Sequence, residues 1–257
     1  MPTPMEAYEK WLNYPHLVPE LKEELEAVRG QDDEIGDRFW RDLGFGTGGL
    51  RGKIGAGTNR MNLYTVAKAA RGIARYLTRA SELASCAIGY DSRRFSREYA
   101  GLMAAVMAEL GVRVHLFEEL VPTPILSFAV RYLRCDGGIM ITASHNPKEY
   151  NGYKVYDNQG GQLTPDAARE VTRFIDQIED FNSVKELTGN PELVEMIGED
   201  VLNAFIGEIK KQSIHQSDLQ VVYTPLHGAG NIPVRRALEG FEVSVVKEQE
   251  LPDGNFS

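Results

Sequence analysis

Cysteine and long apolar runs are both scarce in this sequence of 257 residues, which contains two cysteines, Cys86 and Cys135. There is no C-x-x-C pair and no Cys/His grouping, so a zinc site is not expected. Each cysteine begins an apolar run and fits a small core residue in a reducing compartment. No run approaches the ~20 apolar residues that span a bilayer. The first residues, 1–5, lack the features of a signal peptide. The sequence therefore predicts a cytoplasmic protein with no membrane partner.

An excess of positive charge is also missing, because the net charge is −9 and the isoelectric point is near 5.2. Nonspecific nucleic-acid binding needs a basic surface, so no nucleic-acid partner is expected. A local arginine cluster can still reverse the field inside a cleft, so an anionic small substrate fits this composition. Walker and G-x-G-x-x-G loops are absent as well, which argues against a nucleotide site.

Helical and strand-like segments alternate over most of the remaining chain. Helical faces are expected around 64–78, 99–110, 123–133, 165–178 and 198–212. Apolar or alternating strands are expected at 87–90, 112–116, 138–142, 153–156, 219–223 and 243–246. Strands separated by helices of 10–15 residues indicate crossover units, so the fold class is α/β with a largely parallel sheet.

Residues 5–43 read as three short acidic helices, with Asp32 and Asp33 as caps of the third and Trp40 docking onto the core. Farther along, Ser96 is expected to cap a helix, and Thr164 followed by proline marks another helix start.

The chain is organised around residues 141–156, where the apolar strand 138–142 ends in a polar turn. That turn holds Ser144, His145 and Asn146, and Lys154 follows on the next strand. Open α/β sheets place their chemistry in such loops at strand carboxyl ends. A plain surface turn explains the spacing equally well. A serine hydrolase is disfavoured because adjacent residues at a strand end point apart and no G-x-S-x-G elbow is present.

Two further loops contain arginine next to glycine or aspartate. Residues 45–52 form a glycine-rich turn that contains Thr47 and Arg51. Glycines let backbone N–H groups approach an anion, and arginine offers a fork for phosphate oxygens. Residues 89–96 contain Asp91 and Arg93 between a predicted strand and helix.

These motifs resemble those of one enzyme family. Residues 142–147, Thr-Ala-Ser-His-Asn-Pro, followed by 151–154, Asn-Gly-Tyr-Lys, resemble the phosphoserine loop of the α-D-phosphohexomutases, which include phosphoglucomutases and phosphomannomutases. Residues 46–51 with 60–62 are most similar to the phosphoglucomutase/phosphopentomutase branch, and 224–230 resemble the opening of the second domain.

The resemblance implies a domain organisation. It implies a three-layer αβα domain with a mixed, largely parallel sheet, followed by the start of a second, similar domain. We expect an N-terminal helical extension at 1–44, the first domain at 45–192 and an incomplete second domain at 197–257.

The resemblance also implies the roles of individual residues. Ser144 would carry a phosphoryl group, and Arg51 would neutralise phosphate oxygens. Lys154 would act as general acid or base, and His145 would orient the phosphoserine. These four are the expected catalytic residues.

Substrate and cofactor contacts follow from the same resemblance. Thr47, Arg93 and Asn146 would bind the sugar phosphate or its phosphate group, together with Arg51 and Lys154. Mg²⁺ and a hexose 1,6-bisphosphate would be cofactors. The metal's only ligand within this chain would be the phosphate on Ser144, because the family's Asp-x-Asp-x-Asp-Arg loop is absent.

The expected reaction interconverts hexose 1-phosphate and hexose 6-phosphate, with glucose as the first choice of sugar and mannose or pentose phosphate as alternatives. The family's third domain, which distinguishes the sugars, has no counterpart in this sequence. A second interpretation is therefore a catalytically incomplete N-terminal fragment without mutase activity. For the unfinished second domain we expect either self-association through an unpaired strand edge or partial disorder of that part.

Overall fold

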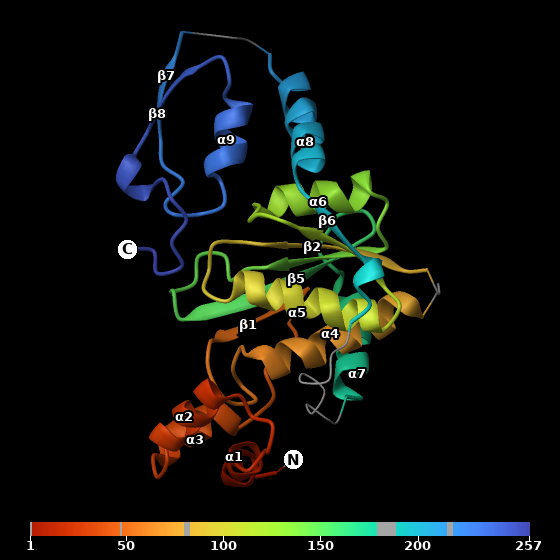
Figure 1. Ribbon diagram of the computed structural model, residues 1–257, viewed down its shortest axis with the longest axis vertical. Coiled ribbons are helices and arrows are strands. Elements are labelled where there is room, and N and C mark those ends of the chain that lie inside the picture. The colour runs from red at the N-terminus through yellow and green to blue at the C-terminus, as the bar shows by residue number, and fades with distance from the viewer. Residues whose placement is uncertain (1, 47, 80–82, 179–188, 215–217) are drawn as a thin grey trace.

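The computed structural model describes residues 2–46, 48–79, 83–178, 189–214 and 218–257, and it forms a central layered body flanked by two smaller parts (Figure 1). Three short N-terminal helices lie on one side of the body. They are α1 (Pro4–Leu12), α2 (Pro19–Ala27) and α3 (Asp32–Phe39). On the opposite side, α8 (Glu199–Lys211) leads from the body to a small C-terminal unit.

The body is built on a six-stranded sheet with the order β1-β5-β4-β2-β3-β6. Its strands are β1 (Gly49–Lys53), β2 (Ser85–Tyr90), β3 (Arg113–Phe117), β4 (Gly137–Ile141), β5 (Tyr150–Asp157) and β6 (Val194–Ile197). β2 pairs in parallel with β3 and β4, and β3 pairs in parallel with β6. β5 runs antiparallel to both of its neighbours, β1 and β4. The expected mixed, largely parallel sheet is confirmed.

Helices cover both faces of this sheet and complete three layers. They are α4 (Leu63–Thr78), α5 (Ser96–Glu109), α6 (Thr123–Tyr132) and α7 (Pro165–Asp176). Strand side chains alternate between the two faces. Ile139 and Ile141 of β4 join the core under α4, α5 and α7, whereas Met140 joins the core under α6 and α8. All five residues of β4 are buried, as expected for a central strand.

Side-chain caps fix the starts of two of these helices. Asn62 accepts hydrogen bonds from the backbone N–H groups of Tyr64 and Thr65 at the start of α4. Thr164 accepts from Ala167 N–H at the start of α7, where Pro165 occupies the first position, as predicted. Each such cap contributes about 1 kcal/mol.

The C-terminal unit is a single crossover of β7 (Gln220–Tyr223), α9 (Asn231–Ala237) and β8 (Glu242–Val245), whose two strands pair in parallel. The chain then returns to the body (Figure 1). There, the Arg93 guanidinium lies 5.1 Å from the centroid of the Phe256 ring.

Several local predictions were wrong. Gln31 precedes α3, so Asp32 and Asp33 lie inside its first turn and do not cap it. Trp40 lies beyond this helix and is 54% exposed, with the Arg41 guanidinium over its ring. Phe95 occupies the N-cap position of α5, and Ser96 is the helix's first residue, whose hydroxyl donates to Asp91 Oδ1 at 2.8 Å.

Two strands were not predicted. β1 occupies the second half of the predicted glycine-rich turn, and β6 pairs with β3 although it begins after residue 192. The first sheet therefore includes residues on both sides of the expected end of the first domain.

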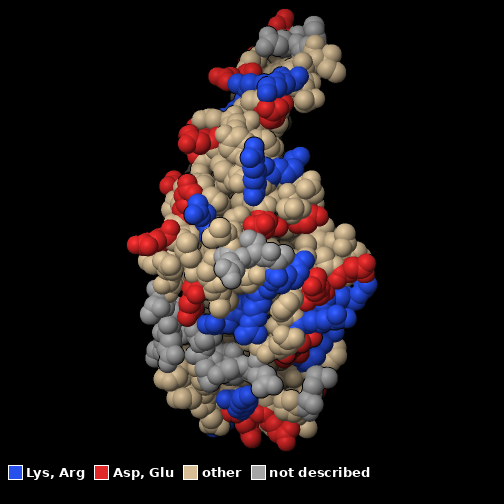
Figure 2. Space-filling model, turned by 90° about the vertical axis from the view of Figure 1, so that its right-hand side faces the viewer, with Lys and Arg blue, Asp and Glu red and all other residues tan. Residues whose placement is uncertain are grey.

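Charge is distributed unevenly over the surface. Viewed from the right-hand side of Figure 1, Lys and Arg gather across the middle of the body, with Asp and Glu beside them (Figure 2). The net negative charge of the sequence is thus compatible with local positive regions. Within the described ranges, every helix is too short or too polar to cross a bilayer.

Candidate functional site

The loop between β4 and β5, residues 142–149, lies at the carboxyl end of β4, as predicted. Ser144 has a φ angle of 58°, in the left-handed region that non-glycine residues rarely adopt. Its N–H donates to Thr142 Oγ1 at 2.9 Å, and Asn146 N–H donates to Ala143 O at 3.1 Å. Such a backbone conformation costs about 1–3 kcal/mol, and surrounding contacts must hold it.

The strained turn exposes Ser144 and brings its hydroxyl towards the imidazole of the next residue. Ser144 Oγ lies 3.4 Å from His145 Nδ1, so the expectation that these side chains point apart is wrong. The positive φ of Ser144 is the reason, because the chain is no longer extended there. In the described part of the chain, no carboxylate forms an ion pair with His145, and so no third member of a hydrolase triad is present.

Arg93 binds the backbone of this loop through both of its terminal nitrogens. Its Nη1 donates to Pro147 O and Tyr150 O, each at 3.0 Å. Its Nη2 donates to Ser144 O at 2.8 Å and to Asn146 O at 2.6 Å. The side chain is 2% exposed, and burial lowers the pKa of its guanidinium, partly offset by Asp91.

Arg93 therefore positions the loop through four backbone carbonyls. The phosphate-binding role expected for it does not follow from these contacts, because both terminal nitrogens already donate twice within the chain. The expected phosphate-binding role stays a prediction, whereas the four contacts show Arg93 positioning the loop.

Asp91 fixes the neighbouring loop at the carboxyl end of β2. Its Oδ1 accepts from Arg93 N–H at 3.0 Å and from Ser96 Oγ at 2.8 Å. Its own N–H donates to Ile141 O at 3.1 Å, which joins the ends of β2 and β4. Sequence reasoning missed Asn151, which is fully buried and donates to Arg94 O and Ser96 Oγ. Its position in an Asn-Gly pair after the loop was the available signal.

Arg51 and Lys154 reach the site from the paired strands β1 and β5. Arg51 lies opposite Gly152, and Lys154 lies opposite Gly49. Paired residues and their second neighbours along each strand share one face of a sheet. Both cations therefore project from the same face, and each faces a glycine that leaves room for it.

Arg51 contacts the loop directly, because its Nη1 lies 3.3 Å from Asn146 Oδ1. The pKa of Lys154 is lowered, first by burial and then by the positive charge of Arg51, and Asp91 partly offsets this. A lowered pKa increases the fraction of neutral amine at a given pH, which is what a proton acceptor requires.

Gly152→Ala is expected to destabilise the protein by about 2–4 kcal/mol. A Cβ at this position would lie 2.2 Å from the backbone oxygen of Leu50, so β1 would have to separate from β5. Chemical denaturation monitored by circular dichroism measures this loss. Gly101→Ala in α5 is the matched control, because nothing lies within 4 Å of its added Cβ. It should be neutral or stabilising by up to about 1 kcal/mol, and equal losses in the two variants would contradict the account.

Two further residues, Thr47 and His227, add little to the description of the site. Thr47 lies outside the described residues. His227 approaches carbonyl oxygens of the C-terminal segment through both ring nitrogens, Nδ1 to Leu251 at 2.9 Å and Nε2 to Ser257 at 3.0 Å, which fits a structural role. The described residues contain no cluster of three or more His, Cys, Asp or Glu side chains that could hold a metal ion.

Family profiles match both parts of the chain. The profile for phosphoglucomutase/phosphomannomutase, alpha/beta/alpha domain I, matches residues 42–182. The profile for domain II of the same family matches residues 200–257. The first match alone covers more than half of the chain.

Curated relatives agree with these profiles. A phosphoglucomutase of Staphylococcus haemolyticus (strain JCSC1435) is 43% identical over 228 residues, which are 85% of this chain and 41% of that protein. A phosphoglucomutase of Staphylococcus aureus (strain MRSA252) is 40% identical over 234 residues, covering 88% of this chain and 42% of that protein. The chain thus spans about two fifths of the length of these relatives.

Solved structures share the fold. A Thermus thermophilus protein provisionally named as a phosphomannomutase superposes with a TM-score of 0.71 at 27% identity, over 84% of this chain and 48% of that one. A phosphoglucomutase/phosphomannomutase family protein from Burkholderia thailandensis superposes with a TM-score of 0.67 at 22% identity, over 82% of this chain and 45% of that one.

Proposed function

Because this chain belongs to the phosphoglucomutase/phosphomannomutase family, we propose that it supplies the phosphoserine part of a sugar-phosphate mutase, with Ser144 as the residue that carries the phosphoryl group. One observation supports this role above the others. The exposed Ser144 hydroxyl stands on a strained loop that Arg93 holds through four carbonyls. A rigid, outward-facing hydroxyl is suited to in-line transfer, which depends on positioning.

The transfer exchanges one P–O bond for another. The bond between phosphorus and Ser144 Oγ breaks as a free hydroxyl of a hexose 1-phosphate forms a new bond to the phosphorus. Lys154 accepts the proton of that hydroxyl and delivers it to Ser144 Oγ. The bisphosphate then returns its other phosphoryl group to Ser144, with the proton moving back, and hexose 6-phosphate is released.

Arg51 neutralises phosphate oxygens during both transfers, and its contact with Asn146 supports this placement beside the loop. His145 and Asn146 orient the phosphate from the same loop. A guanidinium suits this role because it offers paired donors to two oxygens at once. We expect Mg²⁺ and a hexose 1,6-bisphosphate to act with a complete family member.

Glucose phosphate is the proposed substrate, because the curated relatives named above are phosphoglucomutases. Mannose and pentose phosphates are the alternatives. We also propose that the 257-residue chain alone lacks mutase activity, because its sequence contains no Asp-x-Asp-x-Asp-Arg loop. A cytoplasmic setting is consistent with the two free, buried thiols.

The test compares this chain with a completed protein, in which the chain is joined to the part of the Staphylococcus haemolyticus phosphoglucomutase that follows the matched region. Formation of glucose 6-phosphate from glucose 1-phosphate is followed with glucose-6-phosphate dehydrogenase. We expect turnover by the completed protein and none by the chain alone. Turnover by the chain alone would contradict the proposal that it is incomplete. If the completed protein converts mannose 1-phosphate faster than glucose 1-phosphate, mannose phosphate is the substrate.

Self-association through the C-terminal unit remains a proposal. Its two-stranded sheet exposes Val222 (79%), and α9 exposes Ile232 (55%). Leu219, the residue before β7, is 60% exposed. Two-stranded sheets are marginal on their own, and exposed strand edges invite pairing with a second copy. Light scattering of the chain should show a dimer, and a clean monomer with protected amides over 219–246 would refute the proposal.

A further inference from the structure

The C-terminal segment, residues 250–257, packs against the loop that contains Arg93. A Cβ added to Gly254 would lie 2.9 Å from Arg94 N and 3.1 Å from Ser92 O, so the two backbones are in close contact there. Two residues later, the ring of Phe256 lies against the Arg93 guanidinium, whose central carbon is 5.1 Å from the ring centroid. The segment therefore contacts the same arginine that positions the Ser144 loop.

Hydrogen bonds within the segment fix the conformation of Phe256. Asp253 Oδ1 accepts from Asn255 N–H at 2.8 Å, and Asp253 Oδ2 accepts from Ser257 N–H at 3.2 Å. Phe256 N–H donates to Asp253 O at 3.2 Å, which closes a turn. The φ angle of Phe256 is 51°, in the left-handed region that costs a non-glycine residue about 1–3 kcal/mol. The turn thus holds the ring in a conformation that an isolated chain would rarely adopt.

The segment is also joined to the C-terminal unit through His227, in the loop between β7 and α9. Asp253 N–H donates to His227 O at 3.2 Å. The two ring nitrogens of His227 lie within 3.0 Å of the carbonyl oxygens of Leu251 and Ser257. The position of Phe256 on Arg93 therefore depends on the position of the C-terminal unit.

The Arg93 guanidinium is a group that an aromatic ring can stabilise. Its side chain is 2% exposed, and its Nε has no hydrogen-bond partner among the described residues, although Asp91 Oδ2 lies 3.7 Å away. The hydrogen bonds of a guanidinium lie in its plane, so its faces stay free to contact a ring. Contacts between a cation and an aromatic ring are strongest where water is excluded. Phe256 provides such a contact at a buried cation.

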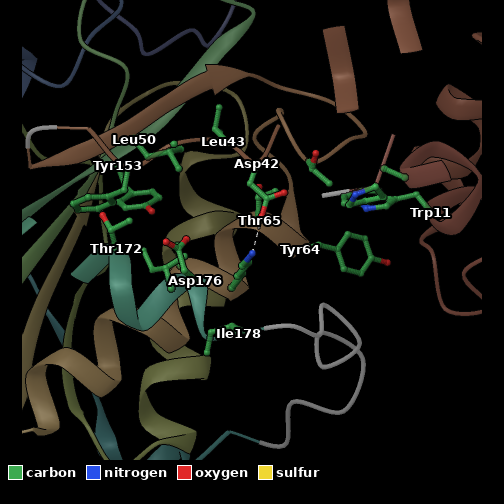
Figure 3. Close-up of a pocket in the computed structure, with 18 of the residues that line it drawn as sticks. Trp11, Asp42, Leu43, Leu50, Tyr64, Thr65, Tyr153, Thr172, Asp176 and Ile178 are labelled. Carbon is green, nitrogen blue, oxygen red and sulfur yellow. Dashed lines mark hydrogen bonds and ion pairs between the residues drawn. The ribbon is translucent and has the colours of Figure 1, made fainter. Parts of the chain in front are cut away.

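The other side of the Ser144 site is less closely packed. A cavity of about 380 Å³ lies between the N-terminal helices and the body, and Leu50 and Tyr153 line it (Figure 3). They are the chain neighbours of Arg51 and Lys154 and project from the opposite face of β1 and β5. A cavity of this size removes packing contacts from the side chains that line it. The side of the site that Arg93 and Phe256 occupy is therefore important for holding it rigid.

From the contact of its ring with a buried, loop-binding cation, we propose that Phe256 is a positioning residue of the mutase reaction. It stabilises Arg93 and, through Arg93, the left-handed conformation of Ser144. The C-terminal unit thereby influences the order of the phosphoserine loop. The effect on turnover rests on the function proposed for Ser144, whereas the effect on the loop does not.

Hydrogen exchange in the 257-residue chain tests the effect on the loop without any need for turnover. The backbone N–H groups of Ser144, Asn146 and Tyr150 donate within the protein, so nuclear magnetic resonance can follow their exchange. Phe256→Ala should accelerate this exchange by about three- to thirtyfold, because the contact with Arg93 is lost. Unchanged exchange in Phe256→Ala would overturn the proposal.

Three further variants identify the cause. Phe256→Tyr keeps an aromatic face and should exchange like the unmodified chain, whereas Phe256→Leu keeps only apolar bulk and should resemble Phe256→Ala. Leu251→Ala is the matched control, because this residue of the same segment is 73% exposed and should leave the loop unchanged. Normal exchange in Phe256→Leu would show that bulk alone is sufficient and would overturn the role of the ring. Circular dichroism verifies that each variant is folded.

Turnover of the completed protein tests the effect on the reaction. Phe256→Ala should lower kcat for glucose 1-phosphate by about three- to thirtyfold and leave KM within about twofold, because it disturbs the serine and not the binding of the sugar. Phe256→Tyr should restore kcat. Faster loop exchange with an unchanged kcat would overturn the positioning role. If the unmodified completed protein shows no turnover, the proposed function fails, and the exchange data still decide whether Phe256 orders the loop.

Discussion

Ser144→Ala is expected to reduce turnover of the completed protein by on the order of 10⁴-fold or more, since replacing a covalent nucleophile removes the reaction path itself. The substituted methyl group offers no oxygen to receive the phosphoryl group. The neighbouring Thr142 hydroxyl cannot replace it, because it accepts the Ser144 N–H and its residue is 5% exposed. The rate of glucose 6-phosphate formation measures the effect.

Ser213→Ala provides the matched control, because this serine is exposed and lies outside the site. It should retain full turnover. Activity of Ser144→Ala within tenfold of the unmodified protein would show that another residue carries the phosphoryl group.

Arg93→Ala is expected to lower the free energy of unfolding by about 3–5 kcal/mol, as when one partner of a buried charged contact is removed. The carbonyls of Ser144, Asn146, Pro147 and Tyr150 would lose the cation that binds all four. The left-handed conformation of Ser144 would then lose its support, so turnover should fall as well. Urea denaturation followed by circular dichroism gives the stability change.

Two companion variants separate the effect of the Arg93 hydrogen bonds from a general effect of its charge. Arg94→Ala removes the same charge from an exposed neighbour and should change stability by less than about 0.5 kcal/mol. Arg93→Lys keeps the charge but lacks the planar fork that serves four carbonyls, so it should recover only a minor part of the loss. Equal stability of Arg93→Lys and the unmodified chain would show that charge alone is sufficient.

The layered fold could be predicted because its central strands and helices carry strong patterns. β4 is a continuous apolar run that is buried throughout, and α4 places Val66, Ala70 and Ile73 on one buried face. β1 could not be predicted, because Gly49, Arg51, Gly52 and Lys53 give it little of the β-branched or aromatic character of a strand. Its pairing depends on a tertiary contact with β5.

β6 was missed for a similar reason. It is a short edge strand whose Glu195 and Met196 are exposed, so its sequence shows no buried pattern. Its strand conformation comes from pairing with β3.

The residues proposed for the site carry a chemical signature in the sequence. Ser144, Arg51 and Lys154 were expected to act together, and the register of β1 with β5 brings the two cations to one face beside the loop. The contacts of Arg93 with the loop were not predictable, because its partners are backbone carbonyls and leave no trace in the side-chain pattern.

Peptide mapping of the completed protein after incubation with glucose 1,6-bisphosphate and Mg²⁺ tests the central role of Ser144 most directly. Cleavage after Arg134 and Lys148 releases residues 135–148, which contain Ser144. We predict that tandem mass spectrometry will find a single phosphoryl group on this peptide, at Ser144, and none on the Ser144→Ala protein. A phosphoryl group on another residue, or its persistence in Ser144→Ala, would contradict the account.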